Sequence, residues 1–476
     1  MSAIRKRSLL LLAVLALPAL GGAGEDAAKA GGTVARDKAW KGRITVERTV
    51  TVARGAVLTI QPGTVVSFRP GAGLTVEGRL VAEGRADALI RFIPEPDPSP
   101  EGWEGIRFTD SAAGSVLSLC EVRGAAAVEI AGPGVGIRNC ELVKGKAGLL
   151  LRPKTDAEVT GNVIQGMSEG GIQCHPGASP RIEKNVIREC GPFGIACPQN
   201  AAPVIRGNDI SGCERGLFVN GAIPPIEGNS FVKNGAGLVA TSAGRGQTIR
   251  GNRFEGNEVG LLCEQFSDPL VEENTFTGNK TALVCFRSSS PLVRRNEIAG
   301  NDQGIVCTQL CHPRIEGNEI RRNGKGIFLT LSSYATVSGN NIHGNAVQME
   351  LGNMSSDWER RVREKPVRGN AAQLATKMER GVAVPGEIRQ LRGDNAVVAA
   401  AVDAAGNWWG EKDTAEMERK GPDADIGGLV DSFDVPVRTY EGYPGEYAQD
   451  RIRYDGWKKS RIPEAGIPGK GKETGK

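Results

Sequence analysis

Asparagine recurs along the middle of this chain at a nearly constant interval. The steps are 23, 23, 23, 21, 23, 22, 22, 22 and 22 residues, and the ten positions are Asn139, Asn162, Asn185, Asn208, Asn229, Asn252, Asn274, Asn296, Asn318 and Asn340. A repeat this short forms one supersecondary unit, which buries its apolar face only by stacking on its neighbours. The interval therefore predicts a solenoid, whose function must come from a surface, a groove or an end.

Each repeat alternates apolar and polar residues, which is the periodicity of a β-strand. Glycine directly precedes the asparagine in several repeats, where a turn requires unusual backbone angles; these glycines are Gly207, Gly228, Gly251, Gly317 and Gly339. Short strands joined by such turns predict an all-β fold of parallel coils. The handedness of parallel crossovers makes the coil right-handed.

Stacked parallel strands lie about 4.8 Å apart, so equivalent residues of successive coils form columns. The inward column two residues after the asparagine contains Phe231, Phe254 and Phe276, which we expect to stack in the core. The asparagines from Asn162 to Asn340 are expected to pair their side-chain amides along the stack. A second such column lies five residues later, at Asn234, Asn257, Asn279, Asn301, Asn323 and Asn345.

These columns resemble the right-handed parallel β-helix repeat family, which includes pectate-lyase-like enzymes and the exported NosD-type accessory proteins of nitrous oxide reductase. The resemblance covers roughly residues 40 to 435. The segments 55–68 and 102–106, and the closing Asp403-Ala-Ala-Gly-Asn-Trp-Trp-Gly410, also resemble the two ends of one exported bacterial subgroup. The resemblance implies the β-helix fold. Most members of that subgroup have no assigned activity, so it implies little about chemistry.

The pattern divides the chain into five parts. Residues 1–24 have a basic start, an apolar stretch and small residues near Ala23, which predict a secretory signal peptide. Residues 40–351 are the predicted β-helix, with N-terminal coils over 40–138 and regular asparagine coils over 139–351. Residues 352–400 form an insertion with a short helix, Trp358 to Lys365, capped by Ser356 and Glu359. Residues 401–445 close the β-structure, and 446–476 are predicted to be a disordered basic tail.

Export and charge limit the partners. The formal charge of +4 falls to +1 without the three basic residues of the predicted signal, which gives no general attraction to nucleic acid. We expect a periplasmic or secreted protein with no membrane span after signal removal. Trp408 and Trp409 are expected to plug the last coil; stacking on a ligand is the alternative.

Ten cysteines raise the question of bridges and metals. The five cysteines Cys174, Cys197, Cys263, Cys285 and Cys307 share an inward column with Val219 and Leu329, which predicts buried thiols. Cys190 and Cys213 replace asparagine in the second column. If export oxidises any thiols, Cys190–Cys213 and Cys174–Cys197 are the candidate disulfides.

No cofactor is predicted. Cys307 to His312 resembles a stretched c-type haem attachment signal, but the columns of the coil already account for these residues. The other histidines, His175 and His343, belong to different coils, so the three histidines are not expected to share a metal.

One outward column alternates in charge at every coil. It runs Glu183, Arg206, Glu227, Arg250, Glu272, Arg294 and Glu316. Cross-strand ion pairing explains the alternation. The alternative is a ligand site for an acidic polysaccharide, because Arg206, Arg250 and Arg294 recur every second coil, about 10 Å apart.

Carboxylates are too scattered to suggest an active site. Between Asn139 and Asn340 the aspartates are Asp156, Asp209, Asp268 and Asp302, in four separate coils, and the adjacent Glu272 and Glu273 are expected to face opposite ways. The sequence therefore favours a non-catalytic binding or scaffold protein of the envelope or extracellular space, contacting an acidic polysaccharide or another envelope protein. A polyuronate lyase, hydrolase or epimerase is the first alternative, and a NosD-like metal-delivery protein is the second.

Overall fold

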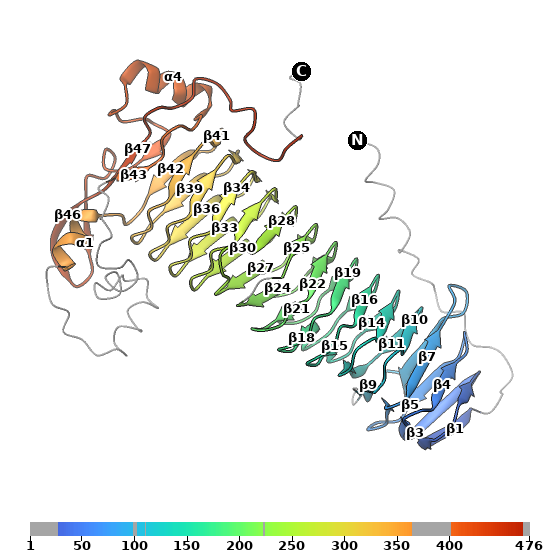
Figure 1. The fold of residues 1–476 in the computed structure, drawn as a ribbon. Coiled ribbons are helices and arrows are strands. Elements are labelled where there is room, and N and C mark those ends of the chain that lie inside the picture. The colour runs from blue at the N-terminus through green and yellow to red at the C-terminus, as the bar shows by residue number, and fades with distance from the viewer. Residues whose placement is uncertain (1–26, 99–101, 110, 222–223, 364–400, 470–476) are drawn as a thin grey trace.

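The computed structural model describes residues 27–98, 102–109, 111–221, 224–363 and 401–469. Figure 1 shows one elongated stack of coils, with β1 at the N-terminal end and α4 at the other. The strands of successive coils pair in parallel, as predicted, and a single continuous apolar core runs through the stack. The predicted signal peptide and most of the predicted insertion lie outside the described residues.

Each regular coil contributes one strand to each of three stacks. The first strand stack contains β2 (Lys38–Trp40), β4 (Val57–Ile60), β7 (Arg79–Glu83), β10 (Val116–Ser118), β13 (Gly136–Arg138), β16 (Glu158–Thr160), β19 (Arg181–Glu183), β22 (Val204–Arg206), β25 (Ile226–Glu227), β28 (Thr248–Arg250), β31 (Leu270–Glu272), β34 (Leu292–Arg294), β37 (Arg314–Glu316), β40 (Thr336–Ser338), β43 (Ala401–Asp403) and β47 (Arg451–Arg453).

The second strand stack contains β5 (Val65–Phe68), β8 (Ile90–Pro94), β11 (Cys120–Arg123), β14 (Glu141–Val143), β17 (Val163–Gln165), β20 (Val186–Arg188), β23 (Asp209–Ser211), β26 (Ser230–Val232), β29 (Arg253–Glu255), β32 (Thr275–Thr277), β35 (Glu297–Ala299), β38 (Glu319–Arg321) and β41 (Asn341–His343).

The third strand stack contains β6 (Gly73–Val76), β9 (Trp103–Phe108), β12 (Ala125–Ile130), β15 (Ala147–Leu151), β18 (Gly170–Cys174), β21 (Phe193–Cys197), β24 (Arg215–Asn220), β27 (Ala236–Thr241), β30 (Val259–Glu264), β33 (Thr281–Phe286), β36 (Gln303–Thr308), β39 (Lys325–Leu329), β42 (Val347–Leu351) and β44 (Leu429–Val430). At the N-terminal end, β1 (Ala28–Val34) and β3 (Arg43–Val52) extend across both the second and the third stack.

The first asparagine ladder lies at the corner between the first and second strand stacks. From Asn162 onward, each buried side-chain amide donates to the Oδ1 atom of the next asparagine, at N–O distances of 2.9–3.1 Å. The ladder does not stop at Asn340, because Asn340 Nδ2 donates to Asn407 Oδ1 at 2.9 Å. Asn407 is thus its last member, although 67 positions separate the two residues in the chain.

Asn139 is not a member of this ladder. Its side chain is exposed and its φ of 53° matches the role of Gly161, with a φ of 70°, in the next coil. The ladder position is taken by Cys140, whose backbone N–H donates to Asn162 Oδ1 at 2.9 Å. In this first coil the asparagine therefore stands one residue before the ladder position. It occupies the turn position instead, because asparagine tolerates a left-handed conformation.

The second asparagine ladder and the phenylalanine stack are confirmed. The six amides from Asn234 to Asn345 pair at 2.9–3.1 Å at the corner between the second and third strand stacks. The ring centroids of Phe231 and Phe254 are 5.0 Å apart, and those of Phe254 and Phe276 are 4.6 Å apart. Side chains one coil apart in the sequence are therefore direct neighbours.

The helix at the start of the predicted insertion is present as α1 (Ser356–Arg363), but its cap differs. Ser355, not Ser356, accepts the Trp358 N–H, at 3.1 Å. The Ser356 hydroxyl donates instead to Asp450 Oδ1, at 2.6 Å. α1 therefore docks on the C-terminal segment.

The predicted tail contains ordered structure up to residue 469. β47 pairs with β43 in the first strand stack, and Arg461 forms an ion pair with Glu319 at 2.8 Å. Composition alone did not reveal these partners. An antiparallel hairpin, β45 (Val437–Tyr440) and β46 (Tyr443–Ala448), and the helix α4 (Gly410–Lys420) complete the C-terminal cap.

Candidate functional site

The alternating column lies in strict register on the first strand stack. Arg206 is opposite Glu227, Glu227 is opposite Arg250, and the pattern continues to Glu316. Arg206 contacts Glu227 at 2.7 Å, and Arg294 contacts Glu272 at 3.0 Å. The arginines predicted to bind a ligand are therefore engaged by glutamates of the same face, as cross-strand pairing requires.

Glu272 and Glu273 do not face opposite ways. Glu273 follows the end of β31 in a left-handed conformation, with a φ of 57°, so the rule of alternation along a strand does not apply to it. Arg250 contacts Glu273 at 2.8 Å and Glu272 at 3.9 Å, and Arg295 also contacts both glutamates. Burial raises the pKa of Glu272, but hydrogen bonds from Arg295 and Arg294 outweigh it and leave the pKa below its usual value. We call Glu272, Glu273, Arg250, Arg294 and Arg295 the ion cluster.

All ten cysteines are buried thiols in the structure. Cys120 and Cys140 continue the first asparagine column, Cys190 and Cys213 occupy the second, and Cys311 stands in a third corner column beside serines such as Ser333. Interaction with the neighbouring thiol and burial raise the pKa of Cys190 and of Cys197. Bridges between Cys190 and Cys213 or between Cys174 and Cys197 stay a prediction.

The three histidines lie in separate places. His175 is beside Arg152, at 3.2 Å, and His343 is bonded to Glu319, at 2.7 Å. Cys307 faces the core and His312 Nδ1 lies 3.2 Å from the carbonyl oxygen of Tyr334, as part of the coil. Among the residues that the structure describes, no three His, Cys, Asp or Glu side chains are grouped to hold a metal ion.

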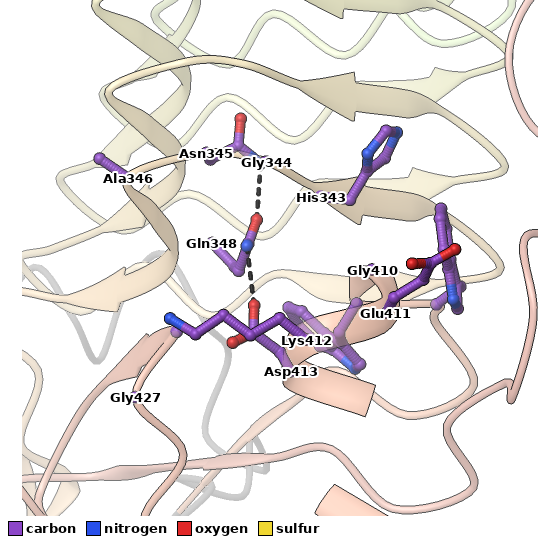
Figure 2. A pocket seen from close by; sticks show the side chains of 13 residues that line it. His343, Gly344, Asn345, Ala346, Gln348, Gly410, Glu411, Lys412, Asp413 and Gly427 are labelled. Atoms are coloured by element: carbon purple, nitrogen blue, oxygen red, sulfur yellow. Dashed lines mark hydrogen bonds between the residues drawn. The ribbon is translucent and has the colours of Figure 1, made fainter. Parts of the chain in front are cut away.

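The C-terminal end of the stack holds a pocket of about 460 Å³. It lies between the last coil and the start of α4, and we call it the end pocket. Its walls come from three segments, 343–348, 408–413 and 427–428. Figure 2 shows His343 and Gln348 on the coil side, and Glu411, Lys412 and Asp413 at the start of α4.

A chain of amides leads from the second asparagine ladder into the end pocket. Asn345 is the last asparagine, and its Nδ2 donates to Gln348 Oε1 at 2.8 Å. Gln348 Nε2 donates in turn to Asp413 Oδ2 at 2.8 Å (Figure 2). Burial nevertheless raises the pKa of Asp413 above its usual value, because this one hydrogen bond does not replace water.

His343, on the coil side of the end pocket, is held by the buried carboxylate of Glu319. Glu319 is buried and accepts hydrogen bonds from His343, Asn341 and Arg461, at 2.7–2.9 Å. Burial alone would raise the pKa of Glu319, but these three donors lower it. The bond to Arg461 fastens the C-terminal segment across the last coils.

Trp408 and Trp409 close the apolar core as the sequence analysis expected of a plug. Trp409 is fully buried and belongs to the core, and Trp408 is 8% exposed. The backbone of Trp408 adds to the last coil, because its N–H donates to the Asn340 carbonyl at 2.9 Å and its carbonyl accepts from Ile342 at 2.8 Å. Both indoles also line the end pocket.

Comparison with known families decides the class of the solenoid. The model of the right handed beta helix region matches residues 126–276 and 263–359. Residues 126–359 are a right-handed β-helix. The β-helix thus includes the column of alternating charge, both asparagine ladders except Asn407, and the coil side of the end pocket.

Solved structures similar to this β-helix are distant. The periplasmic alginate epimerase AlgG is 12% identical, with a TM-score of 0.44, over 65% of this chain and 77% of that chain. An alginate lyase from Paenibacillus sp. str. FPU-7 is 13% identical, with a TM-score of 0.20, over 64% of this chain and 98% of that chain. No curated protein matches the chain. Likeness at these values supports no conclusion about activity.

Among the described residues, no helix is both long enough and apolar enough to cross a bilayer.

Proposed function

We propose that this β-helix is an exported, non-catalytic binding or scaffold protein of the periplasm or extracellular space. The observation that carries the proposal is the ion pairing of the alternating column. The arginines of this column form ion pairs with glutamates of the same face. This is the face on which a polyuronate enzyme would need its substrate groove.

The chemistry of the ion cluster supports this proposal. A retaining or inverting glycosidase uses two carboxyl groups with different protonation states on either side of the scissile bond. Glu272 and Glu273 instead contact the same arginines, Arg250 and Arg295, and the pKa of Glu272 is lowered. A carboxylate held ionised by arginines is a poor general acid at neutral pH.

Export is proposed from the first 24 residues, whose basic start and short apolar stretch fit a secretory signal. Mass spectrometry of the mature N-terminus, from a protein expressed in a bacterium with the full sequence, tests this step. We expect processing near Gly24. A mature chain that keeps residues 1–24 would contradict export.

Turnover is tested directly with a panel of polyuronates, including polymannuronate, polyguluronate and polygalacturonate. Ultraviolet absorbance detects the unsaturated products of a lyase, reducing-end assays detect hydrolysis, and proton NMR detects epimerisation. We expect each polymer to be recovered unchanged. Any product that depends on the protein would overturn the non-catalytic proposal.

The second candidate function is the binding of an acidic polysaccharide by the alternating column, which we call the strip. The specific observation in its favour is the exposure of Arg206 and Arg250, whose side chains are 54% and 50% exposed despite their ion pairs. Arg250→Glu should then weaken binding of polyuronates in affinity electrophoresis. Lys154→Glu, on a turn outside the strip, is the control with the same change in net charge. Equal mobility of the two variants would dispose of the strip as a polyanion site.

A further inference from the structure

The third strand stack presents an apolar face to the outside of the coil. In β24, Leu217 and Val219 are fully buried in the core, so Phe218 between them points outward. The residues in register with Phe218 on consecutive coils are all apolar. They are Ala196, Phe218, Val239, Leu262, Val284, Val306 and Phe328, and we call these seven residues the apolar column.

Most of the apolar column is accessible at the surface. Six of its members are partly exposed, and Val239, which lies between Phe218 and Leu262, is 4% exposed. Val259 and Phe286 flank the column on the same face and are partly exposed too. Figure 1 shows the third-stack strands from β21 to β39 side by side along one flank of the stack. The two described helices pack mainly elsewhere, α1 on β46 and α4 on β41.

The geometry of the coil does not require this composition. The outward column of the first strand stack is the alternating column of charge, and that of the second contains Asp209, Arg253 and Glu297. A polar residue with high strand propensity, such as Thr275 in the second stack, satisfies an outward position equally well. A continuous apolar face rimmed by polar residues instead marks a surface that contacts another molecule.

The apolar column ends in polar residues on both sides. In the register, Gln173 precedes Ala196 and Glu350 follows Phe328. Lys325 forms an ion pair with Glu350, at 2.8 Å, and lies over the ring of Phe328, at 4.7 Å. An apolar centre with a polar rim is the anatomy of a protein–protein interface.

The face is large enough for a stable dimer. From Leu150 to Glu350 it spans nine steps between coils, or about 43 Å, and its strands of up to six residues make it about 16 Å wide. Two such faces in contact would bury on the order of 1,400 Å², and stable interfaces bury about 1,200–2,000 Å².

We propose that the apolar column and the face around it bind a second copy of this chain. In a two-fold arrangement centred on Leu262, with the stacks antiparallel, Leu262 meets its own copy and Ala196, the smallest member of the column, meets Phe328. The amide of Gln173 meets the carboxylate of Glu350, to which it can donate. The face is thus complementary to itself in size and in polarity. The inference is independent of the ligand proposed above.

Sedimentation velocity measures the association directly. The full secreted protein would be run between about 1 and 100 μM, and we expect a dimer with a dissociation constant below about 10 μM. A protein that stays monomeric at about 100 μM would overturn the proposal, whether the face is then covered by residues 364–400 or by a different protein.

A matched pair of variants locates the interface. Leu262→Lys places two lysines against each other on the two-fold axis, so we expect the dissociation constant to rise at least about 100-fold. Leu270→Lys is the control, because Leu270 is also a partly exposed leucine that precedes a glutamate by two residues, but it lies on the first strand stack. Its dissociation constant should stay within about threefold of the original value. Equal association of the two variants would refute the assignment.

Thermal unfolding followed by circular dichroism separates loss of association from loss of folding. Because a dimer is stabilised by mass action, the midpoint of the original protein should rise with protein concentration. Leu262→Lys should abolish this dependence while keeping a cooperative transition, and Leu270→Lys should retain it. Phe328→Thr, which keeps a strand-forming residue and removes an aromatic ring from the column, should weaken association about tenfold. A dimer that both Leu262→Lys and Phe328→Thr leave intact would use another surface and would contradict the proposal.

Discussion

Replacement of Asn274 by alanine tests the first asparagine ladder at its centre. The Asn274 side chain is fully buried and makes four hydrogen bonds. Its Nδ2 donates to Asn296 Oδ1 at 3.0 Å and to the Ile249 carbonyl at 2.9 Å. Its Oδ1 accepts from the backbone N–H and the side-chain amide of Asn252, at 2.9 and 3.1 Å.

The magnitude follows from the groups that alanine leaves behind. The backbone N–H of Asn252 and one of its amide hydrogens lose their acceptor in an interior that water does not reach. Each buried donor without a partner costs about 1–3 kcal/mol, so Asn274→Ala should lower the free energy of unfolding by about 2–6 kcal/mol. Asn139→Gly is the control, because Asn139 is exposed and already adopts a left-handed conformation; we expect it to change stability by less than about 1 kcal/mol.

The assay must report on the middle of the stack. Tryptophan occurs only toward its ends, at Trp40, Trp103, Trp358, Trp408, Trp409 and Trp457, so fluorescence would miss a loss confined to the central coils. Denaturant unfolding should therefore be followed by far-ultraviolet circular dichroism, with fluorescence beside it, because coils that contact only their neighbours can unfold in separate steps. An Asn274→Ala midpoint equal to that of Asn139→Gly would refute the ladder as a source of stability.

Three further outcomes are expected. Phe254→Ala, which breaks two ring contacts of 5.0 and 4.6 Å, should cost about 3–5 kcal/mol in the same unfolding assay, and Phe254→Leu less than about half of that; equal losses would contradict specific stacking. The hydrogen-bond donors around Glu319 lower the pKa of this carboxyl below 4.5. The stabilising effect of the Glu319 carboxylate is therefore present above that pH and is lost as the pH falls through the lowered pKa. In a plot of the thermal midpoint against pH, Glu319→Gln should flatten the fall at acid pH. A thiol reagent should label none of the ten buried cysteines in the native protein and all ten after denaturation without reductant; fewer labels would reveal bridges, which peptide mapping should find at Cys190–Cys213 or Cys174–Cys197.

The regular part of the fold could be predicted from the sequence because one period places whole columns of residues. The stacking of Phe231, Phe254 and Phe276 and the pairing of both asparagine columns follow from that period alone. Errors arose where a residue other than glycine adopts a left-handed turn conformation. Asn139 takes a turn position that glycine usually fills, and Glu273 leaves the strand through a left-handed turn and so joins Glu272 beside Arg250.

The end pocket could not be predicted in this way. It needs Gln348, Asp413 and Gly428 together, and these residues belong to three segments outside any common period. The same holds for Arg461, whose partner Glu319 lies 142 positions earlier. The sequence feature that pointed to the C-terminal end of the stack was Asn407-Trp408-Trp409. The two tryptophans were predicted to plug the last coil, and in the structure they also line the end pocket.

The chain leaves the stack after β42, which ends at Leu351, and rejoins it at β43, which begins at Ala401, so Asn407 continues the ladder of Asn340 across this excursion. The pairing of the coils therefore constrains the two ends of the excursion, Leu351 and Ala401, and not its length. A change in the number of residues between α1 and β43 would leave the pairing of the coils intact. Deletion of a single residue within a strand would do far more damage, since it would turn the following side chains inside out.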